Sequence, residues 1–532
     1  MKDGGRIFLK PILLPVVFLM VIISITVMTF WLFGLSGEFS DLISDLGWGG
    51  VYEVSRAAGN LPVSGVAQET IDFRKMPLLR EMLTAGRFGE LNNTLDGYQR
   101  SFEADPVNEY KLSDAYQSFS VTDRAYEVQF KQWIDHSPGA YQPYLALAVY
   151  YYAEGLESRG TARAGETSRT RFDDMHRYFL KALRNIDQAL ALHPGLPVAY
   201  LLLIGIYNNE GDNASENRTI ETAMKLFPSS MLIMFSALWS NLPRWGGSYE
   251  QMAALARKAE AHINANPCLS ALYGLIYHDQ ARIYRNRKNY QKALALLDKA
   301  LLFGDLWIIY DERARLYCFE LKDYAQALEN VNRSIELRPT KAGSYRLRSI
   351  IYFEKACYYD SKADLERAEL IRPGANDIVE WRKKASDILM GRGHKRFKAD
   401  PRDAIEKYNL ALDFNRENAD AHYWRGRAYY NLNDDASALA DFQSAIAIDP
   451  RHFASYQMIG FILARNRQWE RIIDLWNQYI ALEPDNPGAY IERAGARYRN
   501  RDRQRALQDL KTACALGSEI ACKRYAGWSE ER

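Results

Sequence analysis

The sequence is poor in cysteine, and neither sign of charge dominates it. Five cysteines among 532 residues exclude a fold built on disulfides. Sixty-eight lysines and arginines nearly balance 66 aspartates and glutamates, leaving a net charge of +2. A dedicated nucleic-acid binder would instead carry a strongly basic domain, so we expect no nucleic-acid partner. Glycine (33) and proline (18) occur at ordinary levels, which excludes collagen-like and low-complexity chains.

The sequence also lacks the short motifs that carry common catalytic chemistry. It contains no HExxH, paired CxxC, GxSxG or P-loop pattern. Its eight histidines are scattered singly along the chain. We therefore predict a protein that is not an enzyme and holds no metal or cofactor. The alternative is a carbohydrate-handling or hydrolytic enzyme in residues 71–270, whose catalytic groups would converge from distant positions.

One long hydrophobic run stands near the N-terminus. Pro11–Phe33 is 23 residues long and uncharged, and as a helix it would span roughly 35 Å, enough for a hydrocarbon core of about 30 Å. Trp31, Leu32 and Phe33 stand where a signal peptide would have a small-residue cleavage site. The run therefore predicts an uncleaved signal anchor within residues 1–35, followed by a stalk at 36–70.

The charges that flank this run predict its orientation. Lys2, Arg6 and Lys10 precede it, whereas Glu38 and Asp41 follow it. The positive-inside rule then places the N-terminus in the cytoplasm. We expect a single-pass inner-membrane protein whose bulk is periplasmic. A cytoplasm-facing adaptor of reversed topology is the alternative.

A repeat of 34 residues dominates the C-terminal half. A small residue recurs at Gly426, Gly460 and Ala494, and a second small or apolar position recurs with the same spacing at Ala438, Ile472 and Ala506. Together with Pro450 and Pro484, which close two units, this pattern resembles the tetratricopeptide repeat, in which small residues let two antiparallel helices approach closely. The resemblance implies an all-α, right-handed α-solenoid. We expect about seven units in 271–517, a C-terminal cap at 518–532 and degenerate, repeat-like helices in 71–270.

The N-terminal half carries an RWGGS element at 244–248. With this element, the segment resembles an uncharacterised bacterial family in which a helical domain accompanies tetratricopeptide repeats. Physically, Gly246–Gly247 permits a tight turn, and Ser248 can cap a helix that begins near Tyr249. We expect Trp245 to fill the end of the preceding helical pair. The alternative is a ligand-contacting turn at a helix N-terminus.

Two of the cysteines, Cys514 and Cys522, flank a predicted turn near Gly517. Their arrangement is similar to Sel1-like repeats of exported bacterial proteins. That resemblance implies a disulfide that bridges two helices. The alternative is a pair of small packing residues.

The tetratricopeptide resemblance also implies a binding groove, because the first helix of each unit lines the concave face of such arrays. Seven of the expected groove residues are arginine and two, Asp311 and Asp420, are acidic. We therefore expect an acidic or carboxylate-bearing protein or peptide partner, or an anionic polysaccharide. The alternative is that these arginines pair with carboxylates of neighbouring helices. The other expected groove residues are His278, Arg282, Arg285, Asn286, Arg315, Arg346, Tyr423, Arg427, Tyr430, Asn431, Gln457, Phe461, Arg465, Tyr498 and Arg499.

These features together favour a membrane-anchored scaffold for protein–protein interaction. A solenoid offers an extended binding surface, and the anchor would confine it to the membrane plane. A bacterial cell-envelope complex is the setting that we expect.

Overall fold

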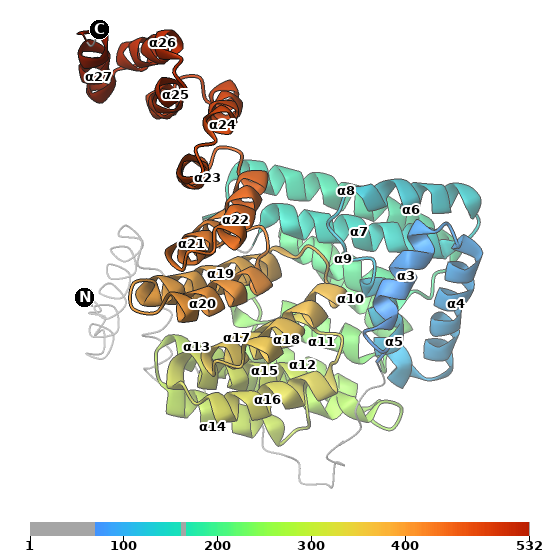
Figure 1. Cartoon of the computed structure of the whole chain (residues 1–532). Coiled ribbons are helices and arrows are strands. Elements are labelled where there is room, and N and C mark those ends of the chain that lie inside the picture. Colours follow the sequence, from blue (N-terminus) through green and yellow to red (C-terminus); the bar gives the residue numbers. More distant parts are fainter. Residues whose placement is uncertain (1–69, 161–165, 531–532) are drawn as a thin grey trace, which may run out of the picture.

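The computed structural model describes residues 70–160 and 166–530, and within them every regular element is a helix (Figure 1). The predicted all-α fold is therefore confirmed for this part of the chain. No helix among these residues combines the length and the apolar character needed to cross a membrane. The predicted anchor in 1–35 and nearly all of the stalk in 36–70 lie outside the described residues.

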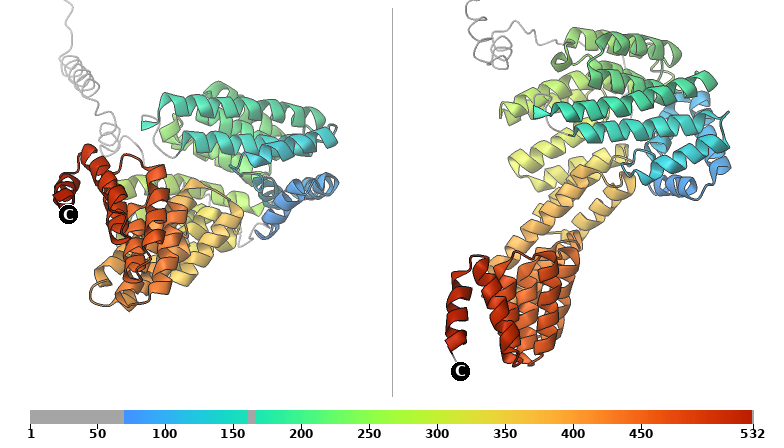
Figure 2. Two further views of the ribbon diagram at one scale, coloured as in Figure 1. Left: turned by 45° about the horizontal axis from the view of Figure 1, so that its top comes forward. Right: turned by 90° about the horizontal axis from the view of Figure 1, so that it is seen from above.

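The N-terminal half is built from short helices followed by three helical hairpins. Helices α3 to α6 come first, and hairpins α7/α8, α9/α10 and α11/α12 follow, with α7 and α8 lying side by side (Figure 2). The bounds are α3 (Lys75–Thr84), α4 (Phe88–Ala104), η1 (Pro106–Asn108), α5 (Glu109–Gln117), α6 (Ala125–His136), α7 (Tyr141–Arg159), α8 (Arg169–Leu192), α9 (Pro197–Glu210), α10 (Asn213–Leu226), α11 (Met231–Ser240), η3 (Pro243–Trp245), α12 (Tyr249–Glu260) and η4 (Pro267–Tyr273).

The C-terminal half consists of seven hairpins in chain order, followed by one more helix. In the second hairpin, the first helix continues directly into a π-helical segment, η5. The bounds are α13 (Gly274–Asn286), α14 (Tyr290–Leu301), α15 (Trp307–Arg315), η5 (Leu316–Leu321), α16 (Tyr324–Leu337), α17 (Ala342–Glu354), α18 (Tyr358–Ile371), α19 (Asn376–Arg396), α20 (Pro401–Phe414), α21 (Ala419–Asn431), α22 (Asp435–Ile448), α23 (Phe453–Arg465), α24 (Trp469–Leu482), α25 (Pro487–Arg499), α26 (Arg503–Ala515) and α27 (Glu519–Glu530).

The turns inside the hairpins show the register of the repeat. Among the residues that the structure describes, six non-glycine residues have a positive φ, and each lies in the turn between the two helices of one hairpin. They form two series, each with a strict spacing of 34 residues, separated by the longer hairpin α19/α20. Because the turn geometry requires this backbone conformation, it recurs even where the residue has a Cβ atom. The two series are Lys288, Lys322 and Ala356, and Asn433, Arg467 and Arg501.

Close helix contact explains the glycines at 426 and 393. A Cβ atom added at Gly426 on α21 would lie 2.9 Å from a ring carbon of Phe442 and 3.1 Å from Cβ of Asp441, both on α22. At Gly393 on α19 it would lie 2.5 Å from the ring of Tyr408 on α20. At these positions the first helix can approach the second only because the side chain is absent.

In three of the hairpins, an arginine on the first helix donates hydrogen bonds both to the helix before it and to the helix after it. Arg425 on α21 donates to both carboxylate oxygens of Asp441 on α22, at 2.8 and 2.6 Å, and to Asn409 on α20 at 2.7 Å. Asp441 is only 4% exposed. Although burial opposes the shift, hydrogen bonds from Arg425 and His422 lower the pKa of Asp441. The same triad recurs as Asn332–Arg348–Asp364 and Asn477–Arg493–Asp509.

A buried ion pair joins the N-terminal helices to the repeats. Arg338, at the end of α16, donates to Asp114 on α5 at 2.5 Å, and both side chains are buried. The guanidinium also lies 3.8 Å from the ring centroid of Tyr110. On α3, Arg80 donates to the backbone oxygen of Ser118 at 3.1 Å and to that of Leu370 in α18 at 2.5 Å. The chain therefore folds back so that its N-terminal layer packs on the second and third hairpins.

The opposite end of the repeats projects from this body. Helices α23 to α27 extend away from the remaining helices and curve toward the C-terminus (Figures 1 and 2). Cys514 on α26 and Cys522 on α27 form a disulfide, with Cα atoms 4.7 Å apart. The other three cysteines, Cys268, Cys318 and Cys357, do not take part in a disulfide.

The unit that follows Arg425 and Asp441 carries apolar residues in place of this ion pair, which suggests a test of what the pair contributes to stability. The positions 34 residues after Arg425 and Asp441 are Ile459 and Leu475. Arg425→Ile should destabilise the chain by about 3 kcal/mol, because it leaves the Asp441 carboxylate buried without its main partner. The double variant Arg425→Ile/Asp441→Leu should recover most of that loss. Urea unfolding followed by circular dichroism measures both. A double variant as unstable as the single one would contradict the proposed role of the pair.

Candidate partner-binding surface

The residues predicted to line a groove lie on the first helices of six of the seven hairpins. They lie on α13, α15, α17, α21, α23 and α25. One of them is inaccessible: His278 is only 3% exposed, and its ring centroid lies 6.4 Å from that of Trp239 on α11. Burial and the nearby Arg282 and Arg244 lower the pKa of His278 to about 3, so the ring is neutral. The packing of α11 therefore removes His278 from any binding surface.

Four of the seven predicted groove arginines have a carboxylate partner within the chain. The partner lies in the next hairpin for Arg285 and Arg346, one turn away for Arg315 and in the preceding hairpin for Arg465. For these four arginines the structure supports the alternative that neighbouring carboxylates neutralise them. The pairs are Arg285–Glu312 at 2.7 Å, Arg315–Asp311 at 2.7 Å, Arg346–Asp377 at 2.9 Å and Arg465–Asp435.

The other three arginines, Arg282, Arg427 and Arg499, form no ion pair with a described residue. Arg427 on α21 packs instead against aromatic rings. Its guanidinium carbon lies 4.7 Å from the ring centroid of Trp424, 5.4 Å from that of Phe397 and 5.7 Å from that of Tyr423. Arg499 lies 5.5 Å from the ring of Trp469 on α24. A guanidinium stacked on aromatic rings keeps its charge and its N–H donors available to a ligand.

Further aromatic side chains continue this surface along α21, α23 and α25. Phe461 on α23 is 48% exposed. Tyr430 lies beneath the guanidinium of Arg465, 4.6 Å away, and Tyr498 stacks on Trp528 of α27 at 4.1 Å. We use the name arm surface for Tyr423, Arg427, Tyr430, Phe461, Arg465 and Arg499.

The remaining predicted residues are polar and lie near the arm surface or at the ends of helices. Gln457 donates to Glu492 on α25 at 3.0 Å. Asp420 lies 3.3 Å from His452. Asn286 and Asn431, at the ends of α13 and α21, are exposed. None of these contacts was evident from the sequence, because each partner belongs to another helix or to a connecting loop.

In the RWGGS element, the prediction for Trp245 is wrong. Trp245 is 49% exposed and does not fill the end of a helical pair. Arg244 points inward instead: it donates to Asp279 on α13 at 2.6 Å, and the Tyr249 hydroxyl donates to the other carboxylate oxygen at 3.0 Å. Ser248 does cap α12, since its hydroxyl accepts from the Gln251 amide at 3.2 Å.

The same region bears on the enzyme alternative. That alternative required converging carboxylates or histidines around Trp245. Asp279 lies beside the element, but Arg244 and Tyr249 already engage both of its oxygens, and the neighbouring His278 is buried and neutral. Across the described ranges, no three His, Cys, Asp or Glu side chains come together as metal ligands.

Comparisons with known proteins agree with the two-part architecture. The profile described as "Tetratricopeptide repeat" matches residues 419–452, and "TPR repeat" matches 402–433. "Domain of unknown function (DUF4034)" matches 75–205, which ends before the RWGGS element. The chain therefore contains tetratricopeptide repeats together with a DUF4034 domain in its N-terminal half.

Individual relatives are distant. The chain is 29% identical over 134 residues to the small glutamine-rich tetratricopeptide repeat-containing protein 2 of Saccharomyces cerevisiae, covering 25% of this chain and 38% of that protein. It is 22% identical to the Hsp70-Hsp90 organizing protein of Triticum aestivum, covering 39% and 35%. It thus spans little more than a third of the length of these curated relatives. Among solved structures, the TPR2AB domain of yeast Sti1 in complex with pHSP90 is 15% identical, with a TM-score of 0.22 and coverage of 44% and 98%.

Proposed function

We propose that the chain is a non-catalytic scaffold that binds a protein or peptide partner on the arm surface. The observation that carries the proposal is Arg427, a guanidinium held by three aromatic rings without an ion pair to any described carboxylate. The wheat relative supports this class of function, because its name assigns it the organising of two other proteins.

The composition of the arm surface favours a partner that offers both carboxylates and apolar side chains. Exposed aromatic rings and arginines are the residues that most often dominate binding energy at protein interfaces. Phe461 supplies an exposed apolar side chain, and Arg427 supplies N–H donors that fit a carboxylate. Four of the predicted arginines are neutralised by carboxylates within the chain. On the arm surface, Arg427 and Arg499 therefore remain to bind acidic groups of a partner. An anionic polysaccharide would use the same guanidinium groups.

We further propose that the N-terminal segment anchors the scaffold in the inner membrane, with the folded part in the periplasm as part of an envelope complex. The uncharged stretch Pro11–Phe33 and the basic residues before it support the anchor and its orientation. The Cys514–Cys522 disulfide suits an oxidising compartment. An anchor also raises the effective concentration of the arm surface near membrane partners.

Site-specific photocrosslinking tests the arm surface. A photoreactive amino acid at Phe461, in the full chain expressed in a Gram-negative host, should give a protease-sensitive adduct. Arg427→Glu should reduce that adduct by at least about tenfold, because a carboxylate would then face the partner's carboxylates. Arg471→Glu is the matched control, since Arg471 is exposed on the second helix, α24.

Two results would contradict the proposal. One is an adduct of equal yield from a photoreactive residue at Leu482, which is 44% exposed on α24 outside the arm surface. The other is an adduct from position 461 that Arg427→Glu leaves unchanged. An adduct that resists protease and yields to glycosidase would assign the surface to a polysaccharide.

Thiol trapping tests the compartment. After acid quenching and denaturation, a maleimide–polyethylene glycol reagent should modify three of the five cysteines, and all five should react only after reduction. The reason is that a disulfide persists in the periplasm, whereas cytosolic reductants keep thiols free. Five modified cysteines before reduction would contradict the periplasmic assignment. Cys514→Ser should raise the unreduced count to four.

A further inference from the structure

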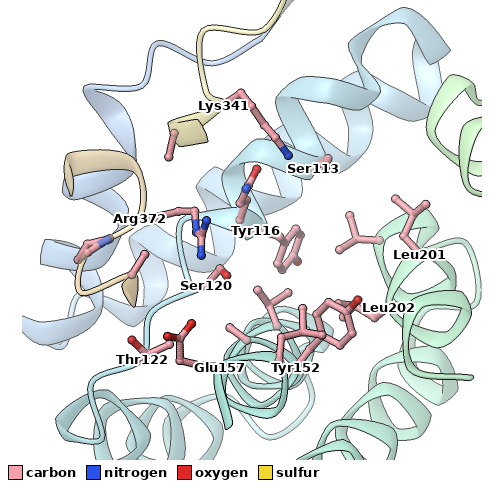
Figure 3. Close-up of a pocket in the computed structure, with 18 of the residues that line it drawn as sticks. Ser113, Tyr116, Ser120, Thr122, Tyr152, Glu157, Leu201, Leu202, Lys341 and Arg372 are labelled. Atoms are coloured by element: carbon pink, nitrogen blue, oxygen red, sulfur yellow. The ribbon is translucent and has the colours of Figure 1, made fainter. Parts of the chain in front are cut away.

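A cavity of about 510 Å³ lies where the N-terminal layer meets the repeats. Helices α5, α7 and α9 form one side, and the start of α17 and the connection between α18 and α19 form the other (Figure 3). This volume falls in the range typical of small-molecule sites. The cavity is separate from the arm surface, and none of the residues predicted from the sequence lines it.

One end of the cavity carries positive charge and hydroxyl groups. Lys341 and Arg372 point into it from the repeats, with Ser113 and Ser120 across from them (Figure 3). Lys341 forms no ion pair with a described residue; its ammonium lies 4.8 Å from the ring of Trp307. Arg372 has one long ion pair, with Asp377 at 3.7 Å. Both cations therefore retain N–H donors for a ligand.

The other end is apolar. Val149 on α7 and Val198 and Leu202 on α9 line it, and each is less than 9% exposed. Leu201 on α9 adds a further aliphatic side chain. A ligand that filled this end would gain about 25 cal/mol for each Å² of apolar surface removed from water.

The charges are not balanced within the lining. Glu157, beside Thr122, is the one carboxylate among the described residues that line the cavity, against the two cations. Burial, reinforced by Arg338, lowers the pKa of Lys341 to about 8, while Asp311 acts in the opposite direction. Lys341 is thus mostly charged at neutral pH although it is desolvated, and Asp311 and Asp114, which form no ion pair with it, offset only part of that unfavourable desolvation. A ligand carboxylate would relieve that cost.

We propose that this cavity binds an organic carboxylate with an aliphatic body, its carboxylate at Lys341 and Arg372 and its body against α7 and α9. Two sources share this chemistry, a free aliphatic acid and the C-terminal residue of a peptide. The inference is independent of the function proposed for the arm surface.

Gly343 offers a clean way to close the cavity. It lines the cavity in the first turn of α17, and a Cβ atom added there would meet nothing within 4 Å. Gly343→Leu should therefore occupy the cavity without a backbone clash, and it should not lower the melting temperature, because glycine is a poor helix residue.

Isothermal titration of the full-length chain, in a non-ionic detergent, tests the site with hexanoate and the neutral hexanamide. Hexanoate should bind one site per chain, and hexanamide at least about tenfold more weakly, since it lacks a charge-assisted hydrogen bond. Gly343→Leu should abolish hexanoate binding. Lys341→Met should weaken it at least about tenfold, whereas Lys383→Met, at an exposed lysine on α19, should leave it unchanged.

A second titration distinguishes the two sources. N-acetyl-Leu-Leu with a free carboxylate should bind more tightly than hexanoate if the site takes a peptide end, and more weakly if it takes a free acid. Three results would overturn the proposal: no saturable binding of either carboxylate, hexanamide binding as tightly as hexanoate, or binding that Gly343→Leu leaves intact. The first two need no variant, so a misfolded variant cannot obscure them.

Discussion

The ion pair between Asp114 and Arg338 joins parts of the chain that are 224 residues apart. Both side chains are buried, so each charge depends on the other, and removing one would leave the other without a partner. The helix that carries Asp114 also carries Glu109, which accepts from the Ser230 hydroxyl at 2.5 Å and from the Leu232 amide at 3.1 Å at the start of α11. Helix α5 thereby fixes the N-terminal hairpins to the repeats. Residues of α5 also line one side of the cavity between the N-terminal layer and the repeats.

The repeat itself could be predicted because its physical cause is local in sequence. The contact at Gly426 lies between the two helices of one hairpin. A small residue is therefore needed once in each unit, and its spacing of 34 residues can be read from the sequence. Inter-helix partners could not be predicted in this way. Arg285 and Arg346 were expected to face a ligand, but Glu312 and Asp377, each in the following hairpin, neutralise them. Which carboxylate reaches which arginine depends on the rotation of one helix against the next.

The N-terminal half shows the same limit. His278 lies on α13, the first helix of the repeats, but Trp239 on α11 covers it. The contact between α11 and α13 could not be predicted from the repeat pattern, because α11 lies before the first repeat. In the RWGGS element, the cap at Ser248 was predictable from a local rule, whereas the inward position of Arg244 depends on Asp279, 35 residues away. The cavity was not predictable at all. Its cations come from two connections between repeat helices, and its apolar wall comes from the DUF4034 region.

The central claim is that the DUF4034 region and the repeats form one body joined at Asp114 and Arg338, from which helices α23 to α27 project. Hydrogen exchange followed by mass spectrometry tests it most directly, on the full chain and its Arg338→Met variant, with Arg333→Met on α16 as the control. The claim predicts that Arg338→Met accelerates exchange together in α5 and in the first turns of α17, and leaves α23 to α26 unchanged. Unchanged exchange in α5 would show that the two parts fold independently and would contradict the account.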